Sequence, residues 1–296
     1  MILYTLYIRI EYKGYQNILM EMLQAMDEHK LNRFAVIGNP VSHSQSPSIH
    51  QAFAEQYGIK LSYEKLLSEP EDFQQSVLQF FAEGGQGLNI TTPFKADAAA
   101  LADRCSVMAE LSESVNTLYL DKDSGELVGE STDGAGWFED AKRLSINLSG
   151  ARVLVIGAGG AARVVINQLL LESVQLIHVC NRTLSKAEKL IDSGVTASNL
   201  EEIPSNSWDL IINTLSVGWQ GNYPTLNVEV CASTKAYDLN YGQGAEAFQK
   251  WFLEAGGLSA NSYEGWGMLV EQAALSFSIW LNKKPDTTAL IEKGPA

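Results

Sequence analysis

Four short polar segments in the first half of the chain carry side chains that could bind and protonate a small, oxygen-rich molecule. In chain order they read SHSQSP at residues 42–47, NITTPFK at 89–95, SVNT at 114–117 and TDG at 132–134. Hydroxyl and amide groups both donate and accept hydrogen bonds, and a lysine beside an aspartate can deliver a proton. Singly, each segment has a plainer explanation: the serines as helix caps, Lys95 as a surface lysine, Asn116 as a turn residue and Asp133 as a helix cap. Their functional interpretation therefore depends on taking the four together.

A glycine-rich turn in the second half, Gly157-Ala158-Gly159-Gly160-Ala161-Ala162, fits the G-x-G-x-x-G/A pattern of dinucleotide-binding proteins. The pattern alone is as typical of a plain tight turn, but here an apolar strand is predicted at residues 152–156 and a helix at 162–171. In that setting Gly157 allows the sharp turn, and Gly159 lets the backbone approach a pyrophosphate. The helix N-terminus offers unpaired N–H groups to the phosphates, so the turn predicts a dinucleotide site.

The tip of the next predicted strand distinguishes NAD from NADP. An NAD site usually places an acidic residue there to hold the ribose hydroxyls. Here the tip reads Asn181-Arg182-Thr183, with Lys186 one helical turn further and no acidic residue before Glu188. A planar, multidentate guanidinium suits a 2′-phosphate. The alternative is an ordinary solvated basic turn, but the otherwise acidic chain favours an NADP site.

Hydrophobic periodicity and turn residues predict alternating strands and helices along the chain. Strands are expected at residues 34–38, 61–66, 87–91, 117–120, 127–129, 153–156, 176–180, 210–213 and 236–239, and further helices at 47–57, 71–83, 96–108, 137–144 and 267–281. The β-α-β-α-β order at the start implies a parallel sheet covered by helices. The strand at 153–156 opens a second α/β unit.

Composition and charge narrow the class of protein. With 296 residues the chain is long enough for two domains, and 46% hydrophobic with 19% charged residues is ordinary for a globular enzyme. A net charge of −14 argues against general affinity for nucleic acid or acidic membranes, although a local basic pocket can still bind an anion. The 3 cysteines and 4 histidines show neither a disulfide framework nor metal-ligand spacing. We expect no metal and a cytoplasmic location.

The first 33 residues form a leader that is harder to assign. Residues 1–15 are apolar and tyrosine-rich but are interrupted by Arg9, Glu11 and Lys13. No small-residue cleavage site follows a long apolar core, so the segment is a poor signal peptide and is too short to span a membrane. An edge strand, a disordered leader and an artefact of start-codon choice remain open.

Taken together, these motifs resemble the shikimate dehydrogenase family. The resemblance lies in Gly38-Asn39-Pro40 through Ser44-Gln45-Ser46-Pro47 and His50, Asn89 to Lys95, Val115-Asn116-Thr117, Ser131-Thr132-Asp133-Gly134, the glycine turn with Asn181-Arg182-Thr183, and Gly267-Met268-Leu269-Val270-Glu271-Gln272-Ala273. The motifs run in the family's order from about Phe34 to Leu281, which is most of the chain. Motifs of this length in sequence are far more specific than a glycine pattern.

The resemblance implies a reversible, NADP-dependent reduction of 3-dehydroshikimate to shikimate in aromatic amino acid (chorismate) biosynthesis. Carried over by position, Lys95 and Asp133 are the catalytic acid/base pair, and the substrate is surrounded by Ser44, Ser46, Thr91, Lys95, Asn116, Asp133, Tyr241 and Gln272. The cofactor is lined by Gly157, Ala158, Gly159, Gly160, Ala161, Asn181, Arg182, Thr183, Lys186, Leu239 and Gly265. The serines would suit the substrate carboxylate.

The fold class implied is α/β, with an N-terminal α/β substrate domain plus a Rossmann-type NADP-binding domain. We expect residues 34–132 and 265–296 to form the substrate-binding and catalytic domain, and residues 133–264 to form the cofactor domain. The active site would lie in the cleft between them. The expected partner is the small-molecule substrate alone, without nucleic acid or membrane, and the expected state is a monomer or homodimer.

Three positions depart from the family's pattern. Ser131 stands where the family usually has Asn, and Leu215 stands where it favours Thr. After Tyr241 the chain has Glu246-Ala247 in place of a frequent Thr-Pro pair. A serine can still cap the turn before Asp133.

Three other functions compete with this interpretation. A quinate/shikimate dehydrogenase with broader substrate and cofactor use is the nearest, but an NAD-user should present an acidic residue in place of the basic tip at 181–183. A catalytically idle, ligand-sensing homologue has no need for both Lys95 and Asp133. A general NADP reductase for another ketone leaves the serine and asparagine pattern unexplained.

Overall fold

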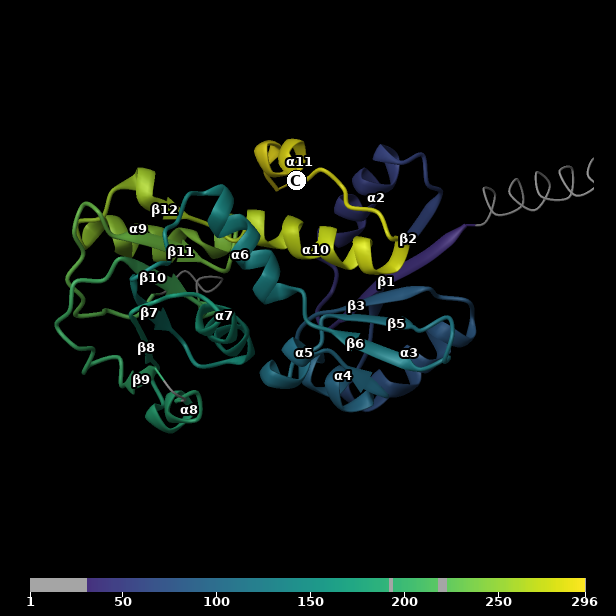
Figure 1. Ribbon diagram of the computed structural model, residues 1–296, viewed down its shortest axis with the longest axis horizontal. Coiled ribbons are helices and arrows are strands. Elements are labelled where there is room, and N and C mark those ends of the chain that lie inside the picture. The colour runs from purple at the N-terminus through teal and green to yellow at the C-terminus, as the bar shows by residue number, and fades with distance from the viewer. Residues whose placement is uncertain (1–30, 192–193, 218–222, 296) are drawn as a thin grey trace, which may run out of the picture.

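The computed structural model describes residues 31–191, 194–217 and 223–295, which form two six-stranded sheets lying side by side (Figure 1). Of the expected leader, residues 1–30 lie outside the described part of the chain. Its last residues, Asn32 and Arg33, already belong to the first strand. Among the described residues, no helix is long and apolar enough to cross a membrane.

The first sheet has the strand order β2-β1-β3-β5-β6-β4. Its strands are β1 (Asn32–Gly38), β2 (Leu61–Leu67), β3 (Gly87–Ile90), β4 (Arg104–Cys105), β5 (Thr117–Leu120) and β6 (Leu127–Glu130). The expected parallel pairing holds for β1 with β2 and β3. It ends at β5, which runs antiparallel to β3 and also forms an antiparallel hairpin with β6. The first sheet is therefore mixed.

Short helices cover the first sheet: α2 (Ser46–Gln56), α3 (Phe73–Ala82) after a 3₁₀ turn at Pro70–Asp72, α4 (Lys95–Leu101) and α5 (Val107–Ser112). The single helix expected at 96–108 is wrong. Its middle forms β4, which pairs with β6, and Asp103 explains the break. The Asp103 N–H donates to the Leu127 carbonyl at 2.9 Å, and its carboxylate accepts from the Leu127 N–H at 2.8 Å. Pairing at the sheet edge thus replaces helical hydrogen bonds.

The second sheet is parallel at all its described pairings, in the order β12-β11-β10-β7-β8-β9. Its strands are β7 (Arg152–Ile156), β8 (Leu176–Cys180), β9 (Val195–Ser198), β10 (Leu210–Asn213), β11 (Lys235–Asp238) and β12 (Ser262–Tyr263), and its helices are α7 (Gly160–Leu170), α8 (Leu184–Glu188) and α9 (Glu246–Glu254). Two 3₁₀ turns lie at Gly242–Gly244 and Ser259–Asn261. The two outer strands, β9 and β12, are additions to the sequence prediction.

Two helices join the sheets: α6 (Asp133–Arg143) and α10 (Trp266–Leu281), which is followed by α11 (Thr288–Lys293). The long α10 lies between the two sheets and α6 packs along it (Figure 1). Gly136 permits this approach, because a Cβ at that position would lie 2.6 Å from the Gln272 backbone nitrogen. The helix pair therefore fixes Asp133, the first residue of α6, close to α10.

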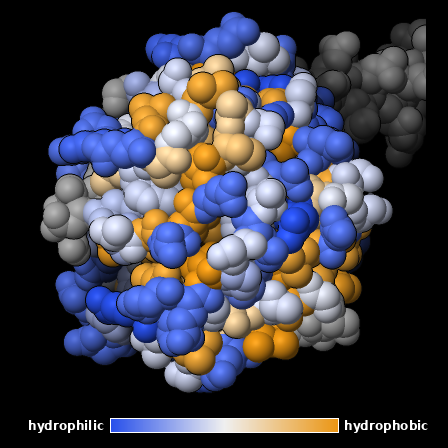
Figure 2. Space-filling view, turned by 90° about the vertical axis from the view of Figure 1, so that its left-hand side faces the viewer, coloured by the Kyte–Doolittle hydropathy of each residue, from blue (hydrophilic) through white to orange (hydrophobic). Residues whose placement is uncertain are grey.

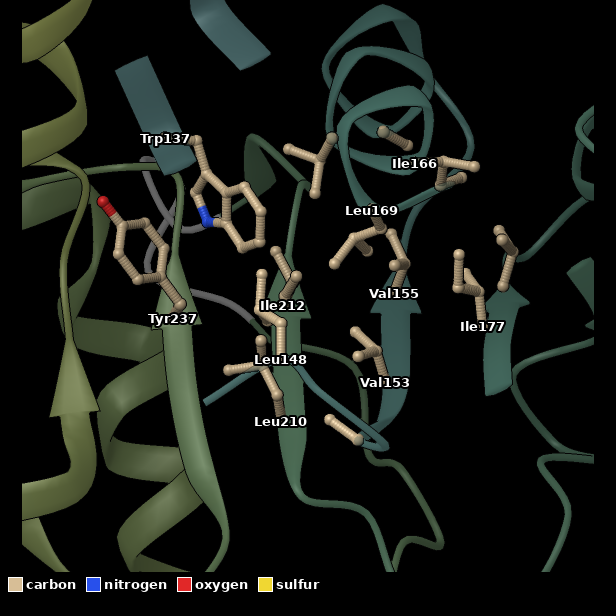
Figure 3. Close-up of a cluster of buried hydrophobic side chains, with 14 of the residues drawn as sticks. Trp137, Leu148, Val153, Val155, Ile166, Leu169, Ile177, Leu210, Ile212 and Tyr237 are labelled. Atoms are coloured by element: carbon tan, nitrogen blue, oxygen red, sulfur yellow. The ribbon is translucent and has the colours of Figure 1, made fainter. Parts of the chain in front are cut away.

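Each sheet has its own hydrophobic core. In the second sheet, Trp137 of α6 and Tyr237 of β11 pack beside aliphatic residues such as Ile212 and Val155 (Figure 3). On the end of the molecule that Figure 2 shows, hydrophilic residues surround and interrupt short hydrophobic strips. The apolar side chains are thus concentrated inside, where they hold the strands whose ends carry the polar segments.

Candidate active site

A cleft of about 1120 Å³ is lined by segments that follow strands of both sheets. All eight expected substrate-binding residues line it, together with two of the expected cofactor residues: Ser44, Ser46, Thr91, Lys95, Asn116, Asp133, Tyr241, Gln272, Leu239 and Gly265. Most of these residues follow the carboxyl ends of parallel strands, which is where α/β sheets bind ligands. The fold therefore brings the four polar segments to one place.

Lys95 and Asp133 form an ion pair at the cleft wall. Lys95 is the first residue of α4, and its Nζ donates a hydrogen bond to Asp133 Oδ2. The lysine side chain is 32% exposed, whereas that of Asp133 is only 11% exposed. The amine is thus open to a ligand while the carboxylate is sheltered behind it. Asp133 does not cap α6 as the sequence suggested, since its side chain binds Lys95 and Asn116 instead.

Asn116 is the centre of a buried hydrogen-bond network behind the ion pair. Its Nδ2 lies 2.8 Å from Asp133 Oδ1, 2.8 Å from Thr132 Oγ1 and 2.9 Å from Gln272 Oε1. Its Oδ1 accepts the backbone N–H of Thr132 at 2.8 Å. A buried polar network in which each member is satisfied holds its side chains in one geometry. Asn116 therefore orients Asp133, and through it Lys95.

Gln272 brings α10 into the same network. Its Nε2 donates to the Leu269 carbonyl at 2.8 Å, which fixes the amide so that Oε1 faces Asn116. The Gln272 carbonyl accepts the Thr132 hydroxyl at 3.0 Å. Gln272 lies 156 residues from Asn116 and 140 residues from Thr132 along the chain. The network therefore joins α10 to segments that are distant in sequence.

The serine segment forms another part of the cleft wall. Ser46 begins α2, and Ser44 Oγ lies 3.2 Å from Ser46 Oγ. Lys65 near the end of β2 donates from Nζ to the Ser42 carbonyl at 2.5 Å and also lines the cleft. Two hydroxyls with a cation beside their loop can bind a carboxylate. The sequence analysis missed Lys65; its signal is a lysine near the carboxyl end of a parallel strand.

His50 lies beneath this wall as a buried, neutral ring. It stacks on Tyr63 with ring centroids 4.6 Å apart and on Trp280 at 5.2 Å. Burial lowers the pKa of His50 to about 3 and raises the pKa of Tyr63. The Tyr63 hydroxyl donates to Asn89 Oδ1 at 2.6 Å. Asn89 lines the cleft, whereas His50, Tyr63 and Trp280 do not, so the stacked rings are packed behind a lining residue.

Tyr241 faces the cleft from the second sheet, after β11. Its ring meets Trp266 edge-on, with centroids 5.8 Å apart. Burial raises the pKa of Tyr241, so its hydroxyl stays protonated and can donate to a ligand. The Gly265 N–H donates to the Asn240 carbonyl at 2.8 Å. This bond places Gly265 beside the segment that contains Leu239 and Tyr241.

The glycine turn connects β7 to α7 at the corresponding edge of the second sheet. Gly157 has a φ of +106°, and a Cβ there would lie 2.4 Å from Thr214 Oγ1. By contrast, a Cβ on Gly159 or Gly160 would meet nothing within 4 Å. This open space lies over the N-terminus of an 11-residue helix that no side chain caps. Free N–H groups beneath open space fit the pyrophosphate of a dinucleotide.

The basic tip after β8 fits the other end of such a cofactor. Asn181 Nδ2 donates to the Thr183 carbonyl at 2.9 Å, which shapes the turn. Arg182, Thr183 and Lys186 are exposed. Within the described residues, neither Arg182 nor Lys186 takes part in an ion pair. Two cations free of carboxylates beside the pyrophosphate turn suit a 2′-phosphate. The glycine turn and this tip do not line the substrate cleft itself.

In the described part of the chain, no three His, Cys, Asp or Glu side chains are grouped as metal ligands.

Comparisons with known proteins agree with this arrangement. Three family models match in chain order: the shikimate dehydrogenase substrate binding domain at residues 36–118, shikimate / quinate 5-dehydrogenase at 139–217, and the shikimate 5'-dehydrogenase C-terminal domain at 265–293. The matched residues include Ser44, Lys95 and Asn116 of the cleft lining, the glycine turn and α10.

Individual relatives and solved structures match over most of their length. A shikimate dehydrogenase (NADP(+)) from Vibrio atlanticus is 42% identical over 269 residues, which is 89% of this chain and 96% of the relative. The crystal structure of an Ael1 enzyme from Pseudomonas putida has a TM-score of 0.81 at 36% identity and covers 90% of this chain and 98% of that one. Thermus thermophilus shikimate 5-dehydrogenase in complex with NADP(H) and shikimate has a TM-score of 0.74 at 30% identity, covering 88% and 97%. The chain therefore belongs to the shikimate dehydrogenase family.

Proposed function

We propose that this protein catalyses the NADP-dependent, reversible reduction of 3-dehydroshikimate to shikimate, a step of chorismate and aromatic amino acid biosynthesis. The observation that carries the proposal is the Lys95–Asp133 ion pair, held by Asn116 at the wall of a cleft that faces both sheets. The Vibrio relative bears the name of this NADP-linked enzyme. The quinate-using and ligand-sensing alternatives are not favoured.

The proton chemistry follows from the position of Lys95. When bound, NADPH supplies the hydride for the carbonyl carbon. Lys95 Nζ donates a proton to the carbonyl oxygen as the C=O electron pair moves onto that oxygen, so that ketone becomes alcohol. The amine then regains a proton from water, which its 32% exposed side chain can reach. In the reverse direction Lys95 accepts the hydroxyl proton.

Asp133 and its neighbours orient this proton transfer. One carboxylate oxygen accepts from Lys95, and the other accepts from Asn116 at 2.8 Å. The carboxylate stabilises the ammonium form and aims its remaining N–H groups at the cleft. We assign Asn116 and Gln272 to the substrate's ring hydroxyls, and Ser44 and Ser46 to its carboxylate.

Cofactor selection follows from the second sheet. Gly159 and Gly160 leave open space for a pyrophosphate, and Arg182 with Lys186 provides positive charge for a 2′-phosphate. Leu239 and Gly265, which border the cleft, continue the cofactor site toward Lys95.

We infer that the chain divides as the sequence predicts, with residues 34–132 and 265–296 binding substrate and residues 133–264 binding NADP. In support, the first sheet comprises strands from residues 32–130 and the second comprises strands from 152–263. We further propose a cytoplasmic enzyme that acts as a monomer or homodimer, with the small-molecule substrate and NADP as its ligands and no nucleic-acid partner, consistent with a net charge of −14.

The test is an absorbance assay of the purified chain with shikimate or quinate, each against NADP⁺ and NAD⁺. We expect reduction of NADP⁺ by shikimate to dominate the four combinations. Higher kcat/KM with quinate, or with NAD⁺, would replace the proposal by the broader dehydrogenase. No turnover in any combination, with shikimate binding retained, would identify a ligand-sensing homologue.

A further inference from the structure

A buried carboxylate in the second sheet lies outside the catalytic pair. Asp238 is the last residue of β11 and is 0% exposed, and among the described residues no cation pairs with it. Its Oδ1 accepts three hydrogen bonds: from the Asn240 backbone at 2.9 Å, Asn240 Nδ2 at 2.7 Å and Asn213 Nδ2 at 2.9 Å. A buried carboxyl group without a cation is costly unless hydrogen bonds compensate it, and these three bonds do so at Oδ1.

The two asparagines carry the contact on to the loop that follows β10. Asn240 Nδ2 donates to the Leu215 carbonyl at 2.8 Å. Asn213 Oδ1 accepts from the Leu215 N–H at 3.2 Å and from the Tyr223 hydroxyl at 3.1 Å. Asp238 therefore joins two segments that are separate in sequence, residues 213–217 and 239–241.

Both segments border the cleft or the glycine turn. Ser216 and Leu239 line the cleft. The Leu215 side chain lies beside Gly157, where a Cβ would be 3.0 Å from Leu215 Cδ2. The joined segments thus form one wall that reaches from the glycine turn to the substrate cleft.

Sheet order decides which half of the cofactor this wall meets. In the order β11-β10-β7-β8, the glycine turn follows β7 and the basic tip follows β8. With the 2′-phosphate at the tip and the pyrophosphate at the turn, the other half of a dinucleotide extends over β10 and β11. That half is the nicotinamide, which must also reach Lys95.

We infer that Asp238 is a positioning residue whose carboxylate fastens residues 213–217 to 239–241 and so holds the wall against which the nicotinamide half of NADP binds. This inference rests on the proposed function. Asp238 acts through Asn213, Asn240 and Leu215 and does not itself line the cleft. Without the Asp238 carboxylate, residues 213–217 are no longer held to residues 239–241, and the nicotinamide site over β10 and β11 widens. The adenine half of NADP keeps its contacts at the glycine turn and the basic tip.

The experiment compares two ligands by isothermal titration: NADP⁺, and adenosine 2′,5′-bisphosphate, which carries the 2′-phosphate but lacks the nicotinamide. For Asp238→Ala we expect NADP⁺ to bind about 10-fold or more weakly and the bisphosphate to stay within about 2-fold, since several hydrogen bonds near one half only are lost. The KM for shikimate should change less than about 3-fold while kcat falls about 10-fold, because the nicotinamide is misplaced and substrate contacts are intact.

Two further variants keep the test independent of folding. Asp238→Asn retains an acceptor at Oδ1, so its NADP⁺ affinity should lie within about 3-fold of the unmodified chain. Asn240→Ala removes the 2.8 Å bond to Leu215 and leaves Asp238 in place, so it should show the Asp238→Ala pattern at smaller size. A thermal melt of each variant identifies any that fails to fold, and the remaining variants then decide.

Equal weakening of both ligands in folded Asp238→Ala and Asn240→Ala would overturn the inference, as would unchanged NADP⁺ binding in both. Those results leave the proposed function standing if the unmodified chain oxidises shikimate with NADP⁺. An unmodified chain that neither binds NADP⁺ nor oxidises shikimate overturns the proposed function itself.

Discussion

On the substrate side of the cleft the polar side chains already bind one another, whereas on the cofactor side the cations and the helix end face open space. Asn116 joins Asp133, Thr132 and Gln272 by bonds of 2.8–2.9 Å. Arg182 is exposed, and a Cβ on Gly159 would meet nothing within 4 Å. One side is arranged before binding, and the other gains its partners on binding.

This difference implies different effects of substitution. A change within the Asn116 network disturbs shared hydrogen bonds and should reduce kcat, because the network sets the geometry of proton transfer. A change on the cofactor side removes a contact made only to ligand and should reduce affinity. Four predictions test the contrast, from the largest expected effect to the smallest.

Lys95→Ala removes the proton donor and leaves Asp133 without its ion pair. We expect kcat to fall about 10²- to 10⁴-fold with a smaller change in KM for shikimate, as for a lost acid/base. Steady-state kinetics measures both. Lys142→Ala is the matched control, since Lys142 pairs with Glu139 on α6 away from the cleft lining. A Lys95→Ala rate within a few-fold of the unmodified chain would contradict the catalytic assignment.

Arg182→Ala removes a cation that forms no ion pair within residues 31–191, 194–217 and 223–295. We expect KM for NADP⁺ to rise about 10- to 100-fold, the range for a charge-assisted hydrogen bond, with kcat and the KM for NAD⁺ nearly unchanged. Lys189→Ala serves as the control, since Lys189 is a lysine directly after α8. Equal losses for NADP⁺ and NAD⁺ would refute a contact to the 2′-phosphate.

Asp238 gives the stability a pH dependence. Burial raises the pKa of Asp238 to about 7 from a usual 3.8, so the folded protein holds a proton that the unfolded chain has released. Its contribution to the free energy of unfolding is full below about pH 4 and is lost as the pH rises through 7. Relative to Asp238→Asn, the unmodified chain should lose on the order of 1 kcal/mol between pH 6 and 8. Urea unfolding at both pH values measures the difference. A constant difference, or one of opposite sign, would show that burial does not penalise this charge.

Lys65→Gln tests the cation beside the Ser44–Ser46 segment, which the sequence analysis did not identify. Lys65 is exposed, so we expect only a 2- to 5-fold rise, roughly, in KM for shikimate, with the KM for NADP⁺ unchanged. Added salt should shrink the effect, and Lys65→Arg should restore most of the affinity. A fall in kcat without a change in KM would assign Lys65 a role other than charge attraction.

Much of the second sheet could be predicted because its signals are local. The glycine turn, the apolar run at 152–156 and the basic tip each lie within a few residues, and the strands at 176–180 and 210–213 have the predicted bounds. The outer strands β9 and β12 carry weaker patterns. β12 has only two residues, so its identity depends on pairing with β11.

The first sheet shows where local pattern fails. Residues 96–108 have helical composition, but Arg104 and Cys105 pair with β6. The sequence alone does not show that β6 lies next to these residues. The same holds for the site. Lys95 and Asp133 were identified by resemblance, but that Asp133 accepts from Asn116 and Lys95 instead of capping α6 depends on how α4, β5 and α6 meet. The role of Asp238 was not predicted because it depends on burial and on a hydrogen bond from Asn213, which lies 25 residues earlier in the chain.

The closely packed helices α6 and α10 lie between the two sheets (Figure 1). Asp133 begins one of these helices and Gln272 lies on the other, at the point where Gly136 lets them touch. If one sheet rotates relative to the other about this helix pair, residues on the two helices move least and residues farthest from them move most. Such a rotation would change the width of the entrance for NADP while Lys95 and Asp133 keep their distance. NADP binding would then depend on the movement of the sheets, and proton transfer would not.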